Sequence, residues 1–300
     1  MTFQGGGNFD SNRVQRRGPG RGGKTAIGGG LGLIALFLIS QALGVDLTPL
    51  AGMMGGDTGM QSGTYQESDL EGCDTADLAN TNDECRYGWT LQSLDTSWAT
   101  ALPQQTGVQY TVPPAVSFTD SVSTACGGAT SATGPFYCPA DETVYVDVSF
   151  YQVLREDFGA SGGSLAQMYI VAHEVGHHLE NITGILGAAE RGGSGANSDS
   201  VKVELMADCL AGMWAGNAAT TINPATGQPD LKPITDAQLA DALDAAAAVG
   251  DDRIQEAATG QVNPHSFTHG TAQQRQNWFA TGYNGATFNQ CNTFEAKSLG

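Results

Sequence analysis

The chain has 300 residues, with 31 acidic and 13 basic side chains that are unevenly distributed. Residues 1–45 hold five basic residues and one acidic residue, a net charge of +4, whereas residues 46–300 hold eight basic and thirty acidic residues, a net charge of −22. The acidic part has few of the basic groups that phosphate contacts need, which argues against nucleic-acid binding. Only one stretch is long and uncharged enough to span a bilayer, which argues against a polytopic membrane protein.

The first 45 residues predict a basic tail followed by a membrane segment. Residues 1–25 are rich in Gly, Arg, Asn and Gln, a composition typical of disorder. Residues 26–45 carry no charge, and about 20 apolar residues span a bilayer as a helix. Basic residues precede this stretch and the next one is Arg86, so the positive-inside rule places the tail in the cytoplasm and the acidic part outside. The alternative is a signal peptide that is cleaved near Ala42, which would make the protein secreted.

The rest of the chain divides into a linker and one domain. Residues 46–70 predict a flexible linker, and residues 71–300 are enough for one sizeable core. The predicted fold class is α+β, mainly helical, with a small sheet before the strongest helix. From hydrophobic spacing, alternation and capping residues we expect helices over 85–102, 164–181, 200–216, 235–258 (with Gly250 as a candidate break) and 271–281, and strands over 108–118 and 143–150.

The six cysteines all lie in the acidic part of the chain, at Cys73, Cys85, Cys126, Cys138, Cys209 and Cys291. An even number of cysteines in an exported domain predicts disulfides. Proximity suggests the pairs Cys73–Cys85 and Cys126–Cys138, which leaves Cys209–Cys291, although six cysteines allow fifteen pairings. No two cysteines have the close C-x₂₋₄-C spacing of a zinc ribbon, so we do not expect cysteine to bind a metal.

Residues 173–177 read His-Glu-Val-Gly-His within the predicted helix over 164–181. Residues four apart lie on one face of a helix, so His173 and His177 can bind one Zn²⁺ at about 2.0–2.1 Å. Glu174 lies beside them, where it can accept a proton from a water molecule that attacks a carbonyl group. The alternative is a buried helix whose histidines only form hydrogen bonds.

A catalytic zinc ion usually has three protein ligands and one open position. The predicted helix over 200–216 offers Glu204 and Asp208, which lie one turn apart among apolar residues. We predict Glu204 as the third ligand and Asp208 as the group that accepts the ring N–H of a ligand histidine. The alternative is that both are surface carboxylates, but the apolar neighbours indicate that at least one points inward.

The sequence HEVGHHLE followed by ELMADCLAG resembles the gluzincin arrangement, in which H-E-x-x-H precedes E-x-x-A-D. The whole chain is similar to the bacterial putative neutral zinc metallopeptidase family, which it also matches in FQGGGNFDSNRV, CDTADLAN and FTHGTAQQRQNWFATGY. The resemblance implies a zincin-like peptidase domain that one membrane segment holds outside the cytoplasm, on the bacterial cytoplasmic membrane. The family name gives a reaction class and no substrate.

The segment FTHG at 267–270 and the later Arg275 resemble the T-H-P…R segment of membrane gluzincins such as the prenyl-protein endopeptidases, with Gly270 in place of proline. This resemblance implies that His269 donates a hydrogen bond to the substrate oxyanion. It also implies that Arg275 pairs with Asp208. The alternative for His269 is a residue at a helix N-terminus that forms only local hydrogen bonds.

The sequence therefore predicts a membrane-anchored zinc metalloendopeptidase that acts on a peptide or protein substrate, with Zn²⁺ as its cofactor. Glu174 is the predicted general base and His269 a further catalytic residue. Two alternatives stay open: a non-catalytic zinc-containing binding or assembly module, and a hydrolase that acts on a cell-wall component. The sequence indicates neither the cleavage preference nor the oligomeric state.

Overall fold

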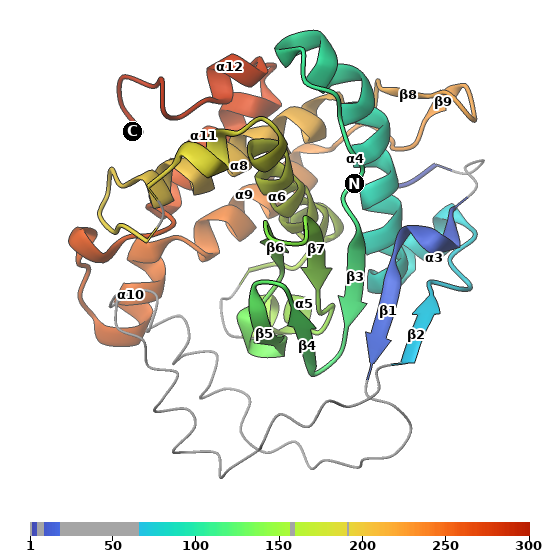
Figure 1. The fold of residues 1–300 in the computed structure, drawn as a ribbon, viewed down its shortest axis with the longest axis horizontal. Helices are drawn as coiled ribbons and strands as arrows, with labels where there is room; N and C mark the ends of the chain where they lie inside the picture. Colours follow the sequence, from blue (N-terminus) through green and yellow to red (C-terminus); the bar gives the residue numbers. More distant parts are fainter. Residues whose placement is uncertain (1, 5–8, 19–65, 157–159, 191) are drawn as a thin grey trace.

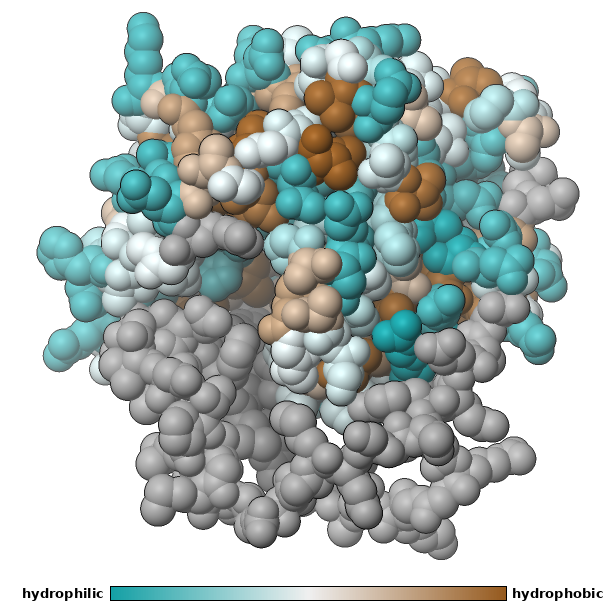
Figure 2. All heavy atoms as spheres, in the orientation of Figure 1, coloured by the Kyte–Doolittle hydropathy of each residue, from teal (hydrophilic) through white to brown (hydrophobic). Residues whose placement is uncertain are grey.

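The computed structural model describes residues 2–4, 9–18, 66–156, 160–190 and 192–300 (Figure 1). These residues form an α+β fold in which helices predominate, as the sequence predicted. The face shown in Figure 2 is mainly hydrophilic, with apolar residues in separate groups. The predicted membrane helix over 26–45 and most of the predicted linker lie outside the described residues. Within the described residues, no helix is both long enough and apolar enough to cross a membrane.

The main sheet has five strands in the order β2-β1-β3-β7-β6. Their bounds are β1 (Gln15–Gly18), β2 (Gln66–Asp69), β3 (Ala115–Phe118), β6 (Phe136–Cys138) and β7 (Thr143–Val146). The pairs β1–β3 and β3–β7 are parallel, whereas β2 and β6 run antiparallel to their neighbours. β7 is therefore an inner strand and β6 an edge strand, and β6 contacts the helix that carries HEVGH.

Both strands predicted from the sequence are shorter in the structure. The strand expected over 108–118 is reduced to β3, because Pro113 and Pro114 have no N–H to donate to a neighbouring strand. The strand expected over 143–150 ends at Val146, and Phe150 already begins the helix α5 (Phe150–Glu156).

The prediction of a disordered tail is wrong for residues 9–18, which belong to the domain. β1 lies between β2 and β3 in the sheet. Two of the basic side chains in this segment form ion pairs, Arg13 with Asp95 and Arg16 with Glu84. Partners so distant in the sequence do not show in the composition of the segment, which is why composition alone suggested disorder.

The helices predicted from the sequence are present and differ only at their ends. The longer helices are α4 (Asp83–Thr106), α6 (Ser164–Ile182), α8 (Asp199–Asn217), α9 (Asp236–Ala248), α10 (Asp251–Thr259) and α11 (Ala272–Tyr283). The candidate break at Gly250 separates α9 from α10. The shorter elements are α3 (Ala76–Thr81), α7 (Ile185–Ala188), α12 (Phe288–Cys291) and the hairpins β4 (Ser121–Thr124) with β5 (Gly127–Thr130) and β8 (Ile222–Asn223) with β9 (Gln228–Pro229).

Glycines allow the helices that carry the site to pack closely. A Cβ atom at Gly176 of α6 would lie 2.9 Å from the Cα atom of Ala207 on α8. A Cβ atom at Gly212 of α8 would lie 2.0 Å from the carbonyl oxygen of Phe279 on α11. Both separations are shorter than real Cβ contacts, so a larger residue would push these helices apart. α8 therefore packs between α6 and α11 and brings polar side chains of all three helices together.

Three disulfides join the six cysteines in the pairing that proximity suggested. They are Cys73–Cys85, Cys126–Cys138 and Cys209–Cys291. The third links α8 to α12 across 82 residues of sequence, so it ties the helix that carries Glu204 to the C-terminal part of the domain.

Candidate active site

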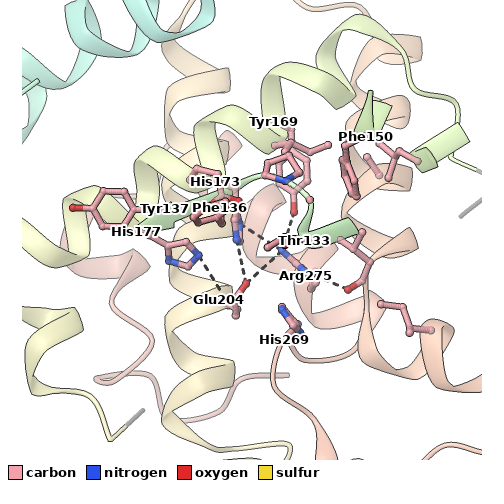
Figure 3. Close-up of a pocket in the computed structure, with 18 residues that line it drawn as sticks. Thr133, Phe136, Tyr137, Phe150, Tyr169, His173, His177, Glu204, His269 and Arg275 are labelled. Atoms are coloured by element: carbon pink, nitrogen blue, oxygen red, sulfur yellow. Dashed lines mark hydrogen bonds and ion pairs between the residues drawn. The ribbon is translucent and has the colours of Figure 1, made fainter. Parts of the chain in front are cut away.

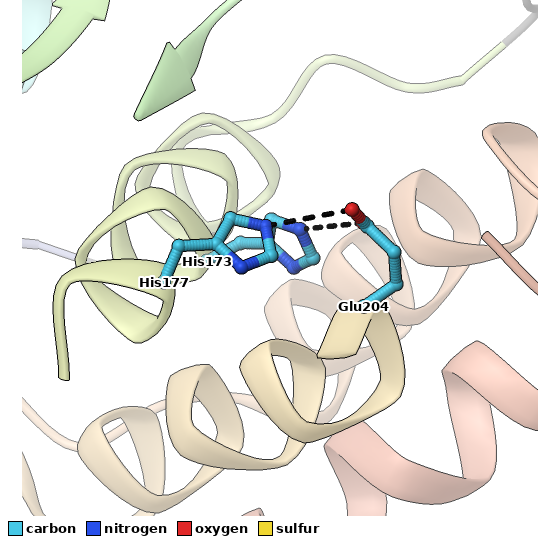
Figure 4. A group of neighbouring side chains, drawn as sticks. All are labelled: His173, His177 and Glu204. Carbon is cyan, nitrogen blue, oxygen red and sulfur yellow. Dashed lines mark hydrogen bonds and ion pairs between the residues drawn. The ribbon is translucent and has the colours of Figure 1, made fainter. Parts of the chain in front are cut away.

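The two histidines of HEVGH and Glu204 meet between α6 and α8 (Figures 3 and 4). His173 and His177 project from one face of α6, and Glu204 faces them from α8. Nε2 of His173 lies 3.1 Å from Oε2 of Glu204, and Nε2 of His177 lies 3.6 Å from Oε1. The candidate ligand atoms of the three residues lie within 4.8 Å of one another. The structure thus brings together the three residues that the sequence predicted as metal ligands.

Each of these histidines has its other ring nitrogen against a buried carboxylate. Nδ1 of His173 lies 2.8 Å from Oδ1 of Asp208, and Nδ1 of His177 lies 2.9 Å from Oε2 of Glu180. A carboxylate that accepts Nδ1–H fixes the ring and leaves the lone pair of Nε2 available to a metal. Two imidazoles oriented in this way, together with one carboxylate, fit the ligand preference of Zn²⁺.

Glu180 is a site residue that the sequence reasoning missed. Its side chain is fully buried, and among the described residues its Oε1 atom has no hydrogen-bond partner. Burial raises the pKa of Glu180 to about 7, although the hydrogen bond from His177 opposes the rise. Its spacing, three residues after His177, is that of neighbours on one helix face, and this signal could have found it.

Protons and a metal cation compete for the nitrogen atoms of this centre. Burial lowers the pKa of His173, but Asp208 and Glu204 outweigh burial and raise this pKa to about 10. For Glu204, burial has the opposite effect and raises the pKa. The charges of His269 and His177 and the contact with His173 outweigh burial and hold this pKa well below its usual range. A metal ion that binds Nε2 of His173 would therefore have to displace a proton.

Asp208 is a buried carboxylate that joins α6, α8 and α11. Arg275 on α11 donates hydrogen bonds from Nε to Oδ2 at 2.8 Å and from Nη2 to Oδ1 at 3.0 Å. The hydroxyl of Tyr169, one turn before His173 on α6, donates to Oδ1 at 2.5 Å. The pair between Arg275 and Asp208, which the resemblance implied, is thus present. Tyr169 was not predicted, because a tyrosine in an apolar helix resembles an ordinary core residue.

Glu174 lies beside the two histidines and lines the cleft. Its residue is only 8% exposed, and burial raises the pKa of its carboxyl group, whereas the charges of His173 and His177 lower it. The backbone N–H of Tyr137, in the edge strand β6, also donates to this carboxylate and lowers its pKa. A carboxylate with a raised pKa beside a metal centre is suited to accept a proton and then release it.

Tyr137 holds the edge strand β6 against α6. Its hydroxyl lies 3.1 Å from Nδ1 of His178 and accepts a hydrogen bond from Nδ2 of Asn181 at 3.0 Å. Nε2 of His178 lies 2.7 Å from the carbonyl oxygen of Thr111, to which it donates, so Nδ1 accepts the hydroxyl proton of Tyr137. His178 is therefore a packed residue that positions the strand, and burial lowers its pKa.

His269 reaches the site from the loop before α11 and points toward Glu204 (Figure 3). Asp251, at the start of α10, holds this loop: its Oδ2 accepts the backbone N–H groups of Thr268, His269 and Gly270 at 2.8, 2.7 and 2.9 Å. Oδ1 of Asp251 lies 3.3 Å from Nδ1 of His269. Burial lowers the pKa of His269, but Glu204 and Asp251 outweigh burial and raise it. The sequence reasoning missed Asp251, because an aspartate at a helix start resembles a simple cap.

The site opens into a cleft with a volume of about 330 Å³. The polar groups of the metal centre lie on one part of its surface, together with His269 and Arg275. Apolar side chains form much of the remaining wall, from Phe136, Phe150, Leu154, Ile170, Ala245, Val249 and Ile254. An apolar cleft with a few convergent polar groups and shifted pKa values is typical of an enzyme site.

An α+β domain whose cleft holds two histidines and one carboxylate that could bind a metal ion, with a further glutamate beside them, has the features of a metal-dependent hydrolase. The chain belongs to the family described as putative neutral zinc metallopeptidase, whose model matches residues 1–294.

Its curated relatives are named as uncharacterized proteins. Rv2575 of Mycobacterium tuberculosis is 49% identical over 232 residues, which cover 77% of this chain and 78% of the relative. YpfJ of Escherichia coli K12 is 37% identical over 298 residues, which cover 96% of this chain and 95% of the relative. No solved structure matches the chain. The relatives therefore support membership of the family, and their names give neither an activity nor a substrate.

Proposed function

We propose that this protein is a zinc-dependent metalloendopeptidase of the gluzincin type with a zincin-like domain. The observation that carries the proposal is the group of His173, His177 and Glu204, whose ligand atoms lie within 4.8 Å of one another in a cleft that Glu174 also lines. The family description names the same reaction class. Metal binding alone does not need Glu174, so its place in the cleft favours catalysis over a non-catalytic zinc module.

The chain's own residues divide the work of hydrolysis among them. His173, His177 and Glu204 would hold the zinc ion, and the carboxylates behind the two histidines keep the rings oriented. Bound zinc supplies Lewis-acid activation of water and of the substrate carbonyl. Glu174 accepts a proton from the attacking water and passes it to the leaving amine, since a buried carboxylate with a raised pKa can do both.

His269 is the proposed donor to the oxyanion that forms on the substrate. Glu204 and Asp251 raise the pKa of His269 and so favour the protonated ring, whose Nδ1 faces Oγ1 of Thr268 and Oδ1 of Asp251; a protonated ring can donate from Nε2. Arg275 has a different role in this proposal, because its guanidinium group is only 4% exposed and is bound to Asp208. It positions Asp208 and hence His173, and it does not need to touch the substrate.

The proposed substrate is an extended segment of a peptide or protein. β6 is an edge strand beside Glu174, and an edge strand can pair with an extended chain through its outward main-chain groups. The apolar cleft walls favour uncharged side chains next to the bond that is cleaved. We also propose that the domain works outside the cytoplasm, because all six cysteines form disulfides, which persist in oxidising compartments.

A substrate panel tests this function. The full-length protein is incubated with mixed-sequence peptides, folded proteins and cell-wall fragments, each with and without a chelator, and zinc is then restored. We expect cleavage of peptide bonds that the chelator abolishes and zinc recovers. Cleavage of wall fragments alone would replace the peptidase by a wall hydrolase, and zinc binding without any hydrolysis would favour the non-catalytic module.

A further inference from the structure

The beginning of the chain is part of the domain's core. Phe3 is 2% exposed, and its ring meets Trp89 of α4 edge-on with centroids 5.5 Å apart. The backbone N–H of Phe3 donates to Oδ1 of Asn80 at 2.8 Å, and a β-bridge pairs Phe3 with Leu231. The first residues are therefore held by side-chain packing and by main-chain hydrogen bonds to parts of the chain far away in sequence.

The segment 9–18 also contributes to the core, through Val14, and to an ion pair, through Arg13. Val14 is fully buried. Arg13 donates from Nε to Oδ2 of Asp95 at 2.6 Å and from Nη1 to the carbonyl oxygen of Pro113 at 3.0 Å. The Arg13 and Asp95 side chains are only 9% and 17% exposed. Removing either side chain would leave the other charge mostly buried and without its charged partner, which destabilises the fold.

β1 is an inner strand of the sheet, and its end lies beside the start of β2. Gly18 lies opposite Gln66 in the antiparallel β1–β2 pair, so the end of β1 and the start of β2 lie together at one end of the sheet (Figure 1). On its other side, β1 pairs in parallel with β3. Without β1, the edge of β3 would be unpaired and β2 would have no neighbour in the sheet.

We propose that residues 2–4 and 9–18 fold in the same compartment as the other described residues, so that β1 and its partners β2 and β3 lie on the same side of any membrane. A single crossing would place β1 on one side of the bilayer and its partners β2 and β3 on the other. Hydrogen bonds between strands and the ion pair of Arg13 with Asp95 cannot form across that distance.

This topology replaces the single-pass arrangement with a cytoplasmic N-terminus that the charge pattern suggested. That argument relied on the basic residues of the tail, but the charges of Arg13 and Arg16 are used in ion pairs with Asp95 and Glu84. If the disulfide-bonded domain lies outside the cytoplasm, the N-terminus lies there too. The inference concerns the fold and does not depend on the proposed peptidase activity.

A topology measurement on the full chain tests the proposal. One epitope is placed before residue 1 and another after residue 300, and the accessibility of each to antibody and protease is measured in intact spheroplasts and after lysis. We expect the two epitopes to behave alike, either both accessible or both protected before lysis. An accessible C-terminal epitope with a protected N-terminal epitope, or the reverse, would overturn the proposal.

A matched pair of arginine variants tests the contact itself. Arg13→Ala should lower the thermal unfolding midpoint of the full-length protein by roughly 5–15 °C, because it leaves the mostly buried carboxylate of Asp95 without its charged partner. Arg253→Ala removes the same charge from an exposed position, where the side chain is 53% exposed, and we expect it to leave the midpoint nearly unchanged. Equal midpoints for the two variants would contradict the shared fold.

Reversing the charges of a second ion pair provides a test that remains available if Arg13→Ala does not fold. Arg16 and Glu84 form a more exposed pair, with side chains 42% and 20% exposed, so single reversals there should be tolerated. Arg16→Glu and Glu84→Arg should each lower the unfolding midpoint, and the double variant should recover part of the loss. If Arg16→Glu lowers the unfolding midpoint equally in the unmodified protein and in the Glu84→Arg variant, Arg16 and Glu84 are not in contact and the proposal is wrong.

Discussion

Asp251 holds both the backbone and the ring of His269. Oδ2 of the carboxylate accepts the backbone N–H of His269 at 2.7 Å, and Oδ1 lies 3.3 Å from its Nδ1 atom. The same oxygen that binds the backbone also accepts two neighbouring N–H groups, so the loop is fixed at several points. One carboxylate at the start of α10 thus sets the direction in which His269 faces the cleft.

The first prediction follows from this pair. His269→Ala should reduce turnover by about 10²–10³-fold, the usual cost of losing one oxyanion donor, while the zinc content stays unchanged, because His269 is not a ligand in this account. Steady-state kinetics and metal analysis of the same sample measure the two effects. His265→Ala is the matched control, since His265 lies exposed on the surface. Loss of zinc in His269→Ala, or full activity, would contradict the assigned role.

Asp251 should also set the upper pH limit of activity. Glu204 and Asp251 both raise the pKa of His269 by favouring the protonated ring, so Asp251→Asn should lower that pKa by removing one of the two contributions. The alkaline limb of the pH profile of kcat/KM would then move to lower pH, because His269 loses its proton earlier. A profile recorded with a peptide substrate tests this. An unchanged alkaline limb would show that another group sets it.

Zinc binding should become tighter as the pH rises. The pKa of His173 is raised to about 10, so protons compete with zinc throughout the neutral range, and each displaced proton adds up to about tenfold in affinity per pH unit. Calorimetry in two buffers of different ionisation enthalpy gives the number of protons released. The raised pKa of His173 also adds to the free energy of unfolding of the zinc-free protein. This contribution is complete at pH values below about 6.5, the pKa of histidine in the unfolded chain, and it is lost as the pH rises through about 10. Zinc affinity that does not change with pH would contradict these shifts.

The carboxylates behind the two histidines should control zinc affinity. Asp208→Asn and Glu180→Gln should each weaken zinc binding by about 10–100-fold, because an amide no longer fixes the ring as an accepting carboxylate does. Competition with a chelator of known affinity measures the change. Glu190→Gln, an exposed glutamate, should bind zinc like the unmodified protein. Wild-type affinity in Glu180→Gln would remove Glu180 from the site.

The close crossing of α6 and α8 should be sensitive to a single methyl group. Gly176→Ala places a Cβ atom 2.9 Å from the Cα of Ala207, and we expect a loss of about 1–3 kcal/mol in the free energy of unfolding. It should also weaken zinc binding, because the crossing sets the distance from Glu204 to the histidines. Gly187→Ala is the control, since a Cβ there meets nothing within 4 Å. Equal unfolding free energies for the two variants would contradict the account.

The meeting of the candidate metal ligands could be predicted from the sequence because its signals are local. His173 and His177 lie one turn apart, and Glu204 and Asp208 share a face of a second apolar helix. The residues that position them were harder to predict. Asp251 contacts His269 only through the tertiary fold, and Tyr169 resembles an ordinary core residue of an apolar helix.

The N-terminal strand was missed for a related physical reason. The segment QRRG of β1 has no alternation of apolar and polar residues, so nothing local predicts a strand. Its order comes from pairing with β2 and β3 and from the partners that Arg13 and Arg16 find far along the chain. Composition describes only the segment itself, whereas these interactions depend on the whole fold.

The most direct test of the central claim is the Glu174→Gln variant, with hydrolysis and zinc content measured on the same preparation. Glu174 accepts the proton but does not bind the metal in this account, so the variant should keep its zinc and lose about 10²–10⁴-fold in turnover of a peptide substrate. Undiminished hydrolysis by Glu174→Gln with zinc still bound would contradict the proposed mechanism.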